Sequence, residues 1–239
     1  MSGEDSPRHN LVANPGFEVL DEHSRMPMGW RRGVERKEIA PDFELDSTVV
    51  HTGKHSARLS SEGNSGTFGY WVTTITGLQG SDTTLTNQSP TDLMIRGKDF
   101  LGIGAYRFRC YFRTKGVDSI AKSISIKARW TNAQGQDVLG EYISSYAQEG
   151  TWYKAEQVLT APIFAKSVGL ELVLQWTATG TVWWDDVSFE EVSPSRHRKV
   201  KVAAVSYALP HRTRIVNSSP RKSRQLAKLE QISFASTSQ

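Results

Sequence analysis

The sequence predicts an all-β protein, a two-sheet antiparallel β-sandwich of the jelly-roll type, over residues 11–192. In this region β-branched and aromatic side chains alternate with polar ones in short runs, at the period of two that a β-strand produces. Gly, Asn, Asp, Ser and Pro separate the runs, as turns require. All seven Trp and most of the seven Tyr and nine Phe lie in this region, so the core-forming side chains are concentrated there.

Nine runs fit the strands of an antiparallel fold, and about this number is typical of a jelly roll. The predicted strands are residues 47–50, 56–60, 69–75, 104–114, 123–131, 140–146, 153–160, 167–176 and 181–190. Residues 132–135 and 178–180 supply the turn-forming residues between neighbouring strands. Residues 79–100 have no clear period, and we expect a long loop there that is a candidate for a functional rim.

The run 104–114 illustrates how the two faces of a predicted strand divide. Alternate residues are apolar and predict the buried face: Tyr106, Phe108, Cys110 and Phe112. The residues between them predict a polar face with one aromatic ring: Arg107, Arg109, Tyr111 and Arg113. Cys110 is the only cysteine, which excludes an intramolecular disulfide, and we expect it to be a small buried side chain rather than a nucleophile.

Charge and targeting signals exclude several classes of partner. The formal net charge is +4, but the basic residues are concentrated in residues 196–239, where Glu230 is the only acidic residue. No aromatic platform accompanies these charges, so we expect a solvated segment and no nucleic-acid partner. No apolar run approaches the ~20 residues of a membrane span. The N-terminus has no apolar signal core, so no export signal is expected in the sequence as given.

The composition divides the chain into four segments. Residues 1–10 are expected to be a flexible N-terminus, residues 11–192 the sandwich, and residues 193–198 a linker. Residues 199–239 then begin a second unit with a strand and a helix that follows Ser219-Pro220. One short strand and one helix bury little apolar area, so we expect this tail to be largely unstructured or limited to those two elements.

Three separated segments of the sandwich form a recognisable pattern. Residues 11–18 read LVANPGFE and are followed by Gly29 and Trp30, residues 50–59 read VHTGKHSARL, and residues 182–189 read VWWDDVSF. In this order and spacing the segments resemble the carbohydrate-binding modules of families 4, 9 and 22, which share the galactose-binding-like jelly roll. The resemblance implies a non-catalytic, monomeric module that binds a poly- or oligosaccharide as part of a larger enzyme. Such a module would be secreted or periplasmic.

The C-terminal segment has a different resemblance. Residues 198–205 read RKVKVAAV, and together with the helix after them they resemble the first strand and helix of nitrilase-type carbon–nitrogen hydrolases. Those enzymes use a Glu, Lys and Cys triad that lies further along the chain. The resemblance therefore implies the truncated start of such a domain, without amidase chemistry.

Asp185 is a carboxylate at a position that the pattern predicts to be buried. It alternates in phase with Trp183 and Phe189, and an ionised buried carboxylate is costly unless a cation or several donors meet it. The family resemblance implies a structural calcium ion here, held by the side chains of Glu18 and Asp185, and such oxygen ligands suit calcium. The carbonyl ligands would come from the second segment: His51, Gly53 and Lys54.

Without a metal, Asp185 would instead pair with Lys54 or Arg58, and Glu18 would cap a turn. Asp186 has the opposite phase and is expected to face solvent.

A sugar site needs an aromatic face for the apolar side of a pyranose and planar polar groups for its hydroxyls. The predicted ligand-binding residues are Trp71, Tyr111, Arg109, Tyr142, Trp130 and Glu141. Trp71 and Tyr111 are the favoured platforms, and Arg129 and Gln175 are further polar candidates. By phase Trp130 fits the core as well as a ligand site, and Trp176 is expected to be core.

No catalytic residue is predicted. Glu141, Glu156 and Glu171 are scattered carboxylates, and the sequence does not set the separation of about 5–9.5 Å that a glycosidase pair needs. The histidines do not have the spacing of zinc ligands. Two other functions stay open: an accessory domain of a nitrilase-type hydrolase without sugar affinity, and a glycan-degrading hydrolase or lyase.

Overall fold

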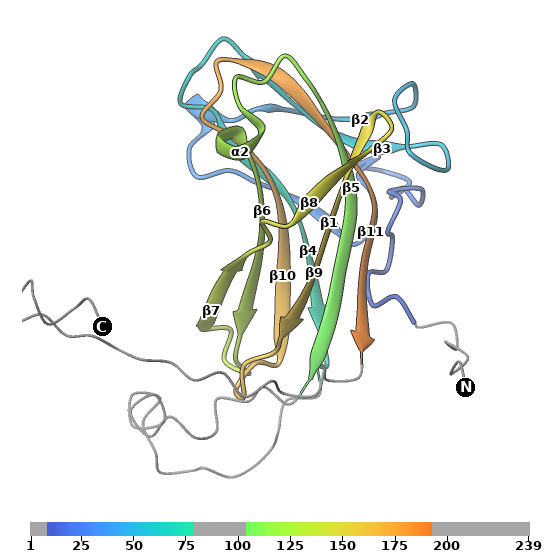
Figure 1. The fold of residues 1–239 in the computed structure, drawn as a ribbon, viewed down its shortest axis with the longest axis vertical. Helices are drawn as coiled ribbons and strands as arrows, with labels where there is room; N and C mark the ends of the chain where they lie inside the picture. The colour runs from blue at the N-terminus through green and yellow to red at the C-terminus, as the bar shows by residue number, and fades with distance from the viewer. Residues whose placement is uncertain (1–8, 79–103, 193–239) are drawn as a thin grey trace, which may run out of the picture. The chain divides into compact units, whose positions relative to one another are not determined.

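The computed structural model describes residues 9–78 and 104–192, which form two antiparallel β-sheets (Figure 1). The strands are β1 (Trp30–Gly33), β2 (Asp42–Asp46), β3 (Ser56–Glu62), β4 (Phe68–Thr76), β5 (Ala105–Lys115), β6 (Ile124–Thr131), β7 (Asp137–Tyr142), β8 (Tyr146–Glu149), β9 (Trp152–Thr160), β10 (Ser167–Gln175) and β11 (Thr179–Val192). The helical elements within these ranges are a 3-10 turn, η1 (Lys37–Ile39), and the one-turn helix α2 (Ile120–Ser123). This architecture confirms the predicted all-β sandwich.

The strand order explains how distant parts of the sequence become neighbours. One sheet has five strands in the order β1-β4-β10-β6-β7, and the other has six in the order β2-β3-β11-β5-β9-β8. The closing strand β11 therefore lies at the centre of the six-stranded sheet, between β3 and β5. All of the described residues belong to one compact unit, residues 1–195.

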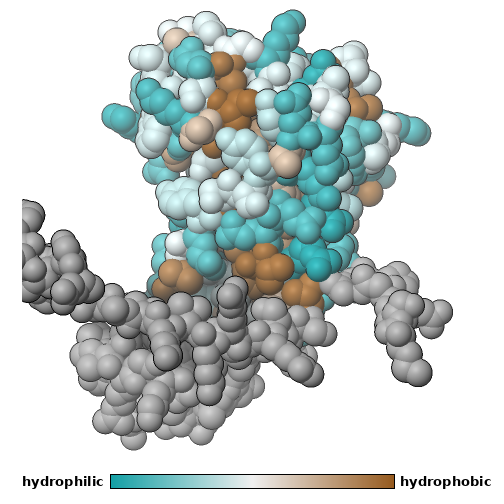
Figure 2. All heavy atoms as spheres, viewed as in Figure 1, coloured by the Kyte–Doolittle hydropathy of each residue, from teal (hydrophilic) through white to brown (hydrophobic). Residues whose placement is uncertain are grey.

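The core fills the space between the two sheets. Trp130 of β6 lies 6.1 Å from Phe189 of β11 between ring centroids, and Phe43 of β2 meets Trp71 of β4 edge to face at 5.4 Å. The predicted buried face of β5 is confirmed, because Tyr106, Phe108, Cys110 and Phe112 are all buried. With these side chains inside, the face seen in Figure 2 has only small apolar patches among hydrophilic residues.

The predicted strands 47–50 and 140–146 were wrong, and one strand was not predicted. Residues 47–50 form a bend, and the strand is β2 immediately before them. Asp46 causes this bend, because its Oδ1 accepts hydrogen bonds from the backbone N–H groups of Thr48 (2.7 Å) and Val49 (3.1 Å). The predicted strand 140–146 is divided between β7 and β8, and the short edge strand β1 was not predicted.

Asp46 is expected to make stability depend on acid pH. Its hydrogen bonds with Thr48, Trp183 and Val49 outweigh the effect of burial and lower the pKa of the carboxyl to about 2. A carboxyl whose pKa is lower in the folded than in the unfolded chain stabilises above its unfolded pKa, and this stabilisation is lost as pH falls toward 2. In urea unfolding between pH 5 and pH 2, the free energy of unfolding should fall less in Asp46→Asn than in the wild type. Equal losses would contradict this role.

The opening segment packs against the closing strand. The side chain of Asn14 donates to the carbonyls of Val19 (2.9 Å) and Met28 (3.1 Å), which closes the loop that contains the N-P-G-F-E sequence. Phe17 is fully buried and lies 4.6 Å from the ring of Trp30. The backbone N–H of Val187 in β11 donates to the carbonyl of Pro15. The first and third segments of the sequence pattern are therefore in direct contact.

Several predictions concern residues outside the described ranges. They are the predictions for residues 1–8 of the flexible N-terminus, for the long loop 79–100, for the linker 193–198 and for the nitrilase-like tail 199–239. Within residues 9–78 and 104–192, no helix has the length and apolar character needed to cross a membrane.

Candidate functional site

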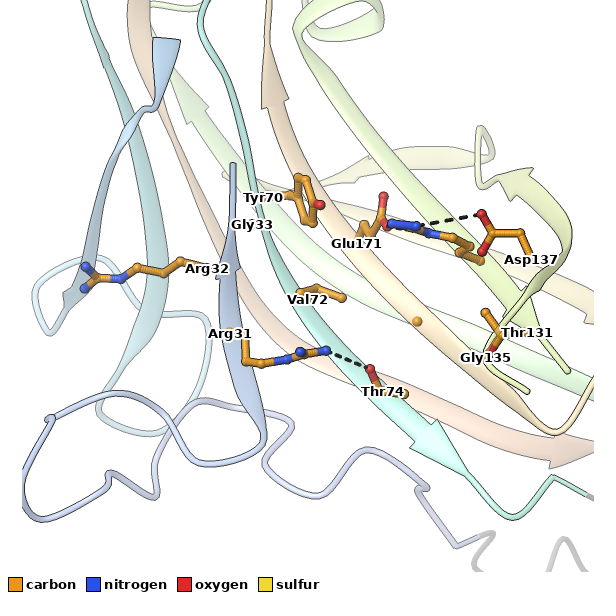
Figure 3. A pocket seen from close by; sticks show the side chains of 12 residues that line it. Arg31, Arg32, Gly33, Tyr70, Val72, Thr74, Thr131, Gly135, Asp137 and Glu171 are labelled. Atoms are coloured by element: carbon orange, nitrogen blue, oxygen red, sulfur yellow. Dashed lines mark hydrogen bonds and ion pairs between the residues drawn. The ribbon is translucent and has the colours of Figure 1, made fainter. Parts of the chain in front are cut away.

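The outer face of the five-stranded sheet contains a hollow of about 400 Å³ (Figure 3). It lies on outward-pointing residues of all five strands, because every second side chain of a strand points away from the core. The principal lining residues are Arg31, Gly33, Tyr70, Val72, Thr74, Arg129, Asp137, Gly169 and Glu171. The register of the strands places Arg31 beside Val72, and Val72 beside Glu171.

Tyr70 forms an aromatic wall of this hollow because its neighbour on β1 is a glycine. Gly33 pairs with Tyr70 in the sheet, and a Cβ on Gly33 would come within 2.1 Å of the Tyr70 ring. The ring therefore occupies the space that a side chain would need. The ring borders the open hollow (Figure 3).

Arg129 and Glu171 form the charged floor of the hollow. Glu171 is 5% exposed, and its Oε1 accepts hydrogen bonds from Arg129 Nη2 (2.8 Å) and Nε (3.1 Å). Asp137 lies at 3.8 Å from Arg129 Nη1. Partial burial works against the charge of Arg129, but Glu171 and Tyr70 raise the pKa of the guanidinium above its ordinary value. The pair thus fixes planar donor and acceptor groups at the base of the hollow.

Arg31 is a second cation at the edge of the hollow. Its Nη2 lies 3.4 Å from Thr74 Oγ1, and within the described residues it forms no ion pair with a carboxylate. The next residue, Arg32, points to the other side of β1 in Figure 3 and lies over the rings of Phe43 and Trp71. The guanidinium of Arg31 can therefore donate to a bound molecule.

The structure does not bring the six predicted sugar-binding residues together. Trp71 was predicted to be a partly exposed platform, and this was wrong because it is 0% exposed and packs in the core. Trp130 is also fully buried, so the core alternative holds for it, and its indole N–H donates to Glu141 Oε1 at 2.7 Å. Tyr142 is 64% exposed at the end of β7, on the five-stranded sheet.

Arg109 and Tyr111 lie on the outer face of the other sheet. Arg109 donates to Glu156 Oε2 at 2.9 Å, and Tyr111 is stacked on His51 with ring centroids 3.8 Å apart. Because β5 belongs to the six-stranded sheet, these two side chains cannot share a site with Tyr142 on the outer face of the five-stranded one.

Arg31 and Tyr70 were not predicted as site residues, and the prediction for Trp176 was wrong. Tyr70 and Trp71 are consecutive aromatic residues, and the alternation pattern alone does not say which of them faces inward. Trp176 was predicted to be core, yet it is 51% exposed because its backbone leaves the strand with a positive φ of 49°. Arg129, considered earlier as a polar partner, does lie in the hollow.

The three candidate acids do not form a catalytic pair. Glu156 is on the six-stranded sheet, where it binds Arg109 and Lys154. Glu141 accepts a hydrogen bond from the indole N–H of Trp130, and Glu171 accepts one from the guanidinium of Arg129.

The carboxylates predicted to hold calcium converge on one loop. Asp185 is 0% exposed, and its Oδ2 accepts hydrogen bonds from the backbone N–H groups of His51 (2.7 Å) and Thr52 (3.2 Å). Glu18 Oε1 accepts from the N–H groups of Lys54 (2.7 Å) and His55 (3.1 Å). Burial is the largest effect on Asp185 and raises its pKa to about 6, despite these donors.

Two glycines lie next to these carboxylates. A Cβ on Gly16 would lie 3.6 Å from Asp185 Oδ1 and 3.8 Å from Glu18 Oε1, so both oxygens border the same small space. A Cβ on Gly53 would lie only 2.1 Å from Glu18 Oε1. The two carboxylates thus border one space, and calcium bound there stays a prediction.

The loop of residues 51–55 donates backbone N–H groups to both carboxylates. The carbonyl ligands predicted at His51, Gly53 and Lys54 stay a prediction. The described residues contain no group of three or more His, Cys, Asp or Glu arranged to hold a metal. Asp186 was predicted to face solvent, but it has a positive φ of 47° beside a β-bulge and accepts a hydrogen bond from Thr52 Oγ1 at 2.6 Å. Neither Lys54 nor Arg58 forms an ion pair with Asp185, since Arg58 pairs with Asp42 and Glu44.

Comparisons with known proteins agree with the β-sandwich architecture. The enzymatically active domain of tailspike protein 4 from bacteriophage CBA120 is similar in structure, with a TM-score of 0.51, 14% identity and 77% of this chain covered. The match spans 21% of that tailspike chain. At this identity the likeness extends to the fold alone.

Two smaller modules were also matched. The CBM22-1 xylan-binding domain of Paenibacillus barcinonensis Xyn10C has a TM-score of 0.48 and 11% identity, with 79% of this chain and 97% of that one covered. TmCBM61, solved in complex with β-1,4-galactotriose, has a TM-score of 0.43 and 11% identity, with 76% and 97% covered. No protein-family model matches the sequence, and a search of curated proteins finds no significant match.

Proposed function

We propose that the sandwich is a non-catalytic carbohydrate-binding module that holds a poly- or oligosaccharide in the hollow of the five-stranded sheet. The observation that carries this proposal is the combination of the Tyr70 ring with the paired Arg129 and Glu171 in one open hollow. An aromatic ring can pack against the apolar face of a pyranose, and fixed planar polar groups can bind its hydroxyls. The three sequence segments that resemble families 4, 9 and 22 support the same class of ligand.

Tyr70 supplies the apolar contact in this proposal. Arg31 donates hydrogen bonds to sugar oxygens from the edge of the hollow, while Arg129, Glu171 and Asp137 offer both donors and acceptors at its base. Because Arg129 and Glu171 already hold each other in place, they lose little side-chain entropy when a ligand arrives. The module acts as a monomer and leaves any bond cleavage to another domain.

Calcium has a structural role in this proposal. The ion would be held by Glu18 and Asp185, between the opening segment and β11, with carbonyl oxygens from His51, Gly53 and Lys54. It would supply positive charge beside Asp185, a carboxylate that burial makes costly to ionise. Asp185 lies on β11 of the six-stranded sheet and Glu18 contacts the loop before β3, so the ion would stabilise the fold rather than contact the sugar.

Affinity electrophoresis against β-glucans, xylans, mannans and galactans tests the proposal. The wild type should be retarded by at least one of these polysaccharides. In calorimetry with the retained polysaccharide, Tyr70→Ala and Arg31→Ala should each weaken binding about tenfold, equivalent to about 1.4 kcal/mol. Retention by none of the polysaccharides would contradict the proposal.

A matched control is available on the opposite sheet. Arg109→Ala removes an arginine that also pairs with a glutamate on a neighbouring strand, and Tyr111→Phe changes the aromatic residue predicted earlier to bind sugar. Both variants should bind as the wild type does. A loss in these variants with none in Tyr70→Ala would move the site to the six-stranded sheet. Arg129→Ala is a poor probe, since it would leave the buried Glu171 without its partner.

A further inference from the structure

A second hollow of about 490 Å³ lies where β10 ends and the chain passes through Gln175 and Trp176. Aromatic side chains line it on several sides: Phe68, Tyr142, Tyr146 and Trp176. Tyr142 and Trp176 are 64% and 51% exposed, and they are the most exposed aromatic side chains among the described residues. Polar groups complete the wall: Ser125, Ser144 and Gln175. Exposed rings with a few polar groups beside them match the two kinds of surface on a pyranose.

Trp176 is held outside the core by its backbone. The alternation of β10 buries Leu170, Leu172 and Leu174 and would bury residue 176 next. Instead Trp176 has a left-handed φ of 49°, a conformation that is unfavourable for a residue with a Cβ. Its N–H donates to the carbonyl of Thr67 at 2.7 Å, which fixes this geometry. Strained residues of this kind cluster at ligand sites.

The second hollow adjoins the first along β4 and β10, and it is also lined by Tyr146 of β8 in the six-stranded sheet. In the register of β4 and β10, Tyr70 pairs with Val173 and Phe68 pairs with Gln175. Tyr70 lines the first hollow and Phe68 the second, and their rings meet edge to face with centroids 6.1 Å apart. No other strand separates the two hollows, since β4 and β10 contribute to both.

We propose that the hollow around Trp176 and Tyr142 is a second sugar subsite, which binds the apolar face of a pyranose further along a linear oligosaccharide. This inference rests on the proposed function of the first hollow. The seven residues from Gly169 to Gln175 span about 20 Å of strand, so a ligand that contacts both ends must contain several sugar rings. The groove therefore selects internal stretches of extended chains, and affinity grows with chain length.

Titration calorimetry with linear xylo- and galacto-oligosaccharides, from disaccharide to hexasaccharide, tests the inference. Wild-type affinity should rise with length for the series that binds. Trp176→Ala should weaken the longest member about tenfold, equivalent to about 1.4 kcal/mol, and leave the shortest member unchanged. Tyr142→Ala should act in the same direction, while Trp176→Phe should retain most of the affinity because it keeps an aromatic face.

Val158→Ala is the control, since Val158 is 51% exposed on β9 of the other sheet. It should bind every length as the wild type does. If the wild type binds and Trp176→Ala loses nothing at any length, the second subsite is refuted while the proposed function stands. If the wild type binds no oligosaccharide or polysaccharide, both are refuted. Sedimentation velocity that finds a dimer converted to monomer by Trp176→Ala would assign the surface to self-association and also overturn the inference.

Discussion

Replacement of Trp71 by alanine is expected to destabilise the fold by about 3–5 kcal/mol, the cost typical of truncating a fully buried large aromatic side chain. Trp71 is 0% exposed, meets Phe43 edge to face at 5.4 Å, and its indole N–H lies 3.3 Å from the carbonyl of Arg58. The substitution would leave a cavity between the two sheets and remove a hydrogen bond to β3. Urea denaturation measured by circular dichroism gives the change in the free energy of unfolding.

Trp176→Ala is the matched control for this prediction. It is the same chemical change at a side chain that is 51% exposed, and exposed substitutions usually alter stability by about 0.5 kcal/mol or less. The two variants should thus separate stability from binding: Trp71→Ala lowers the unfolding free energy, and Trp176→Ala lowers affinity for long oligosaccharides. A Trp71→Ala protein as stable as the wild type would contradict the buried position of this ring.

Calcium added to metal-stripped protein is expected to raise the free energy of unfolding, and chelation should reverse the change. A ligand that binds only the folded state stabilises it by RT ln(1 + [L]/Kd), about 2.7 kcal/mol at a hundredfold excess over Kd. The effect follows from the proposed site, where Glu18 in the opening segment and Asp185 in β11 border one space beside Gly16. Thermal melts with calcium and with EDTA measure it.

Asp185→Asn is the decisive variant for the calcium prediction, because it keeps the size of the side chain and removes its charge. It should no longer respond to calcium, whereas Glu62→Gln, at an exposed carboxylate on β3, should respond as the wild type does. Asp186→Ala is unsuitable as a control, since Asp186 also contacts the loop through Thr52 and His51. Sugar binding should survive in Asp185→Asn, because the proposed groove lies on the other sheet.

The metal-free protein offers a second measurement at the same residue. Burial raises the pKa of Asp185 to about 6, so the folded protein holds this proton more tightly than the unfolded chain does. The free energy of unfolding should therefore fall as pH rises from about 4 to about 6, and Asp185→Asn should lack this contribution. A wild-type melting curve that ignores both calcium and chelator would eliminate the ion and leave Asp185 stabilised by its backbone donors alone.

The sequence by itself determined the fold class, and the family resemblance indicated that Glu18 and residues 51–54 lie close to Asp185. Alternation with a period of two predicted the buried face of β5, because a strand with one apolar face can bury it only against a second sheet. Asp185 is buried as predicted, but not by its phase: it pairs with Tyr111 on the outer face of β5, whereas Phe189 pairs with the buried Phe108, because a β-bulge lies between Asp185 and Ser188. Alternation is a local pattern that can be recognised within a few residues, whereas the position of a bulge depends on strand pairing.

The tertiary structure decided where a ligand can bind. Tyr70 and Trp71 are adjacent aromatic residues, and only the packing of β4 against the second sheet determines that Trp71 is inside and Tyr70 outside. Arg109 and Arg129 look alike in their strands, yet strand order places them on opposite sheets. The side chain of Trp176 lies outside the core because the residue has a positive φ, and alternation does not predict such a backbone angle. The strands that form the groove are distant in the chain. Strand pairing and register, rather than local sequence, therefore determine which residues line it.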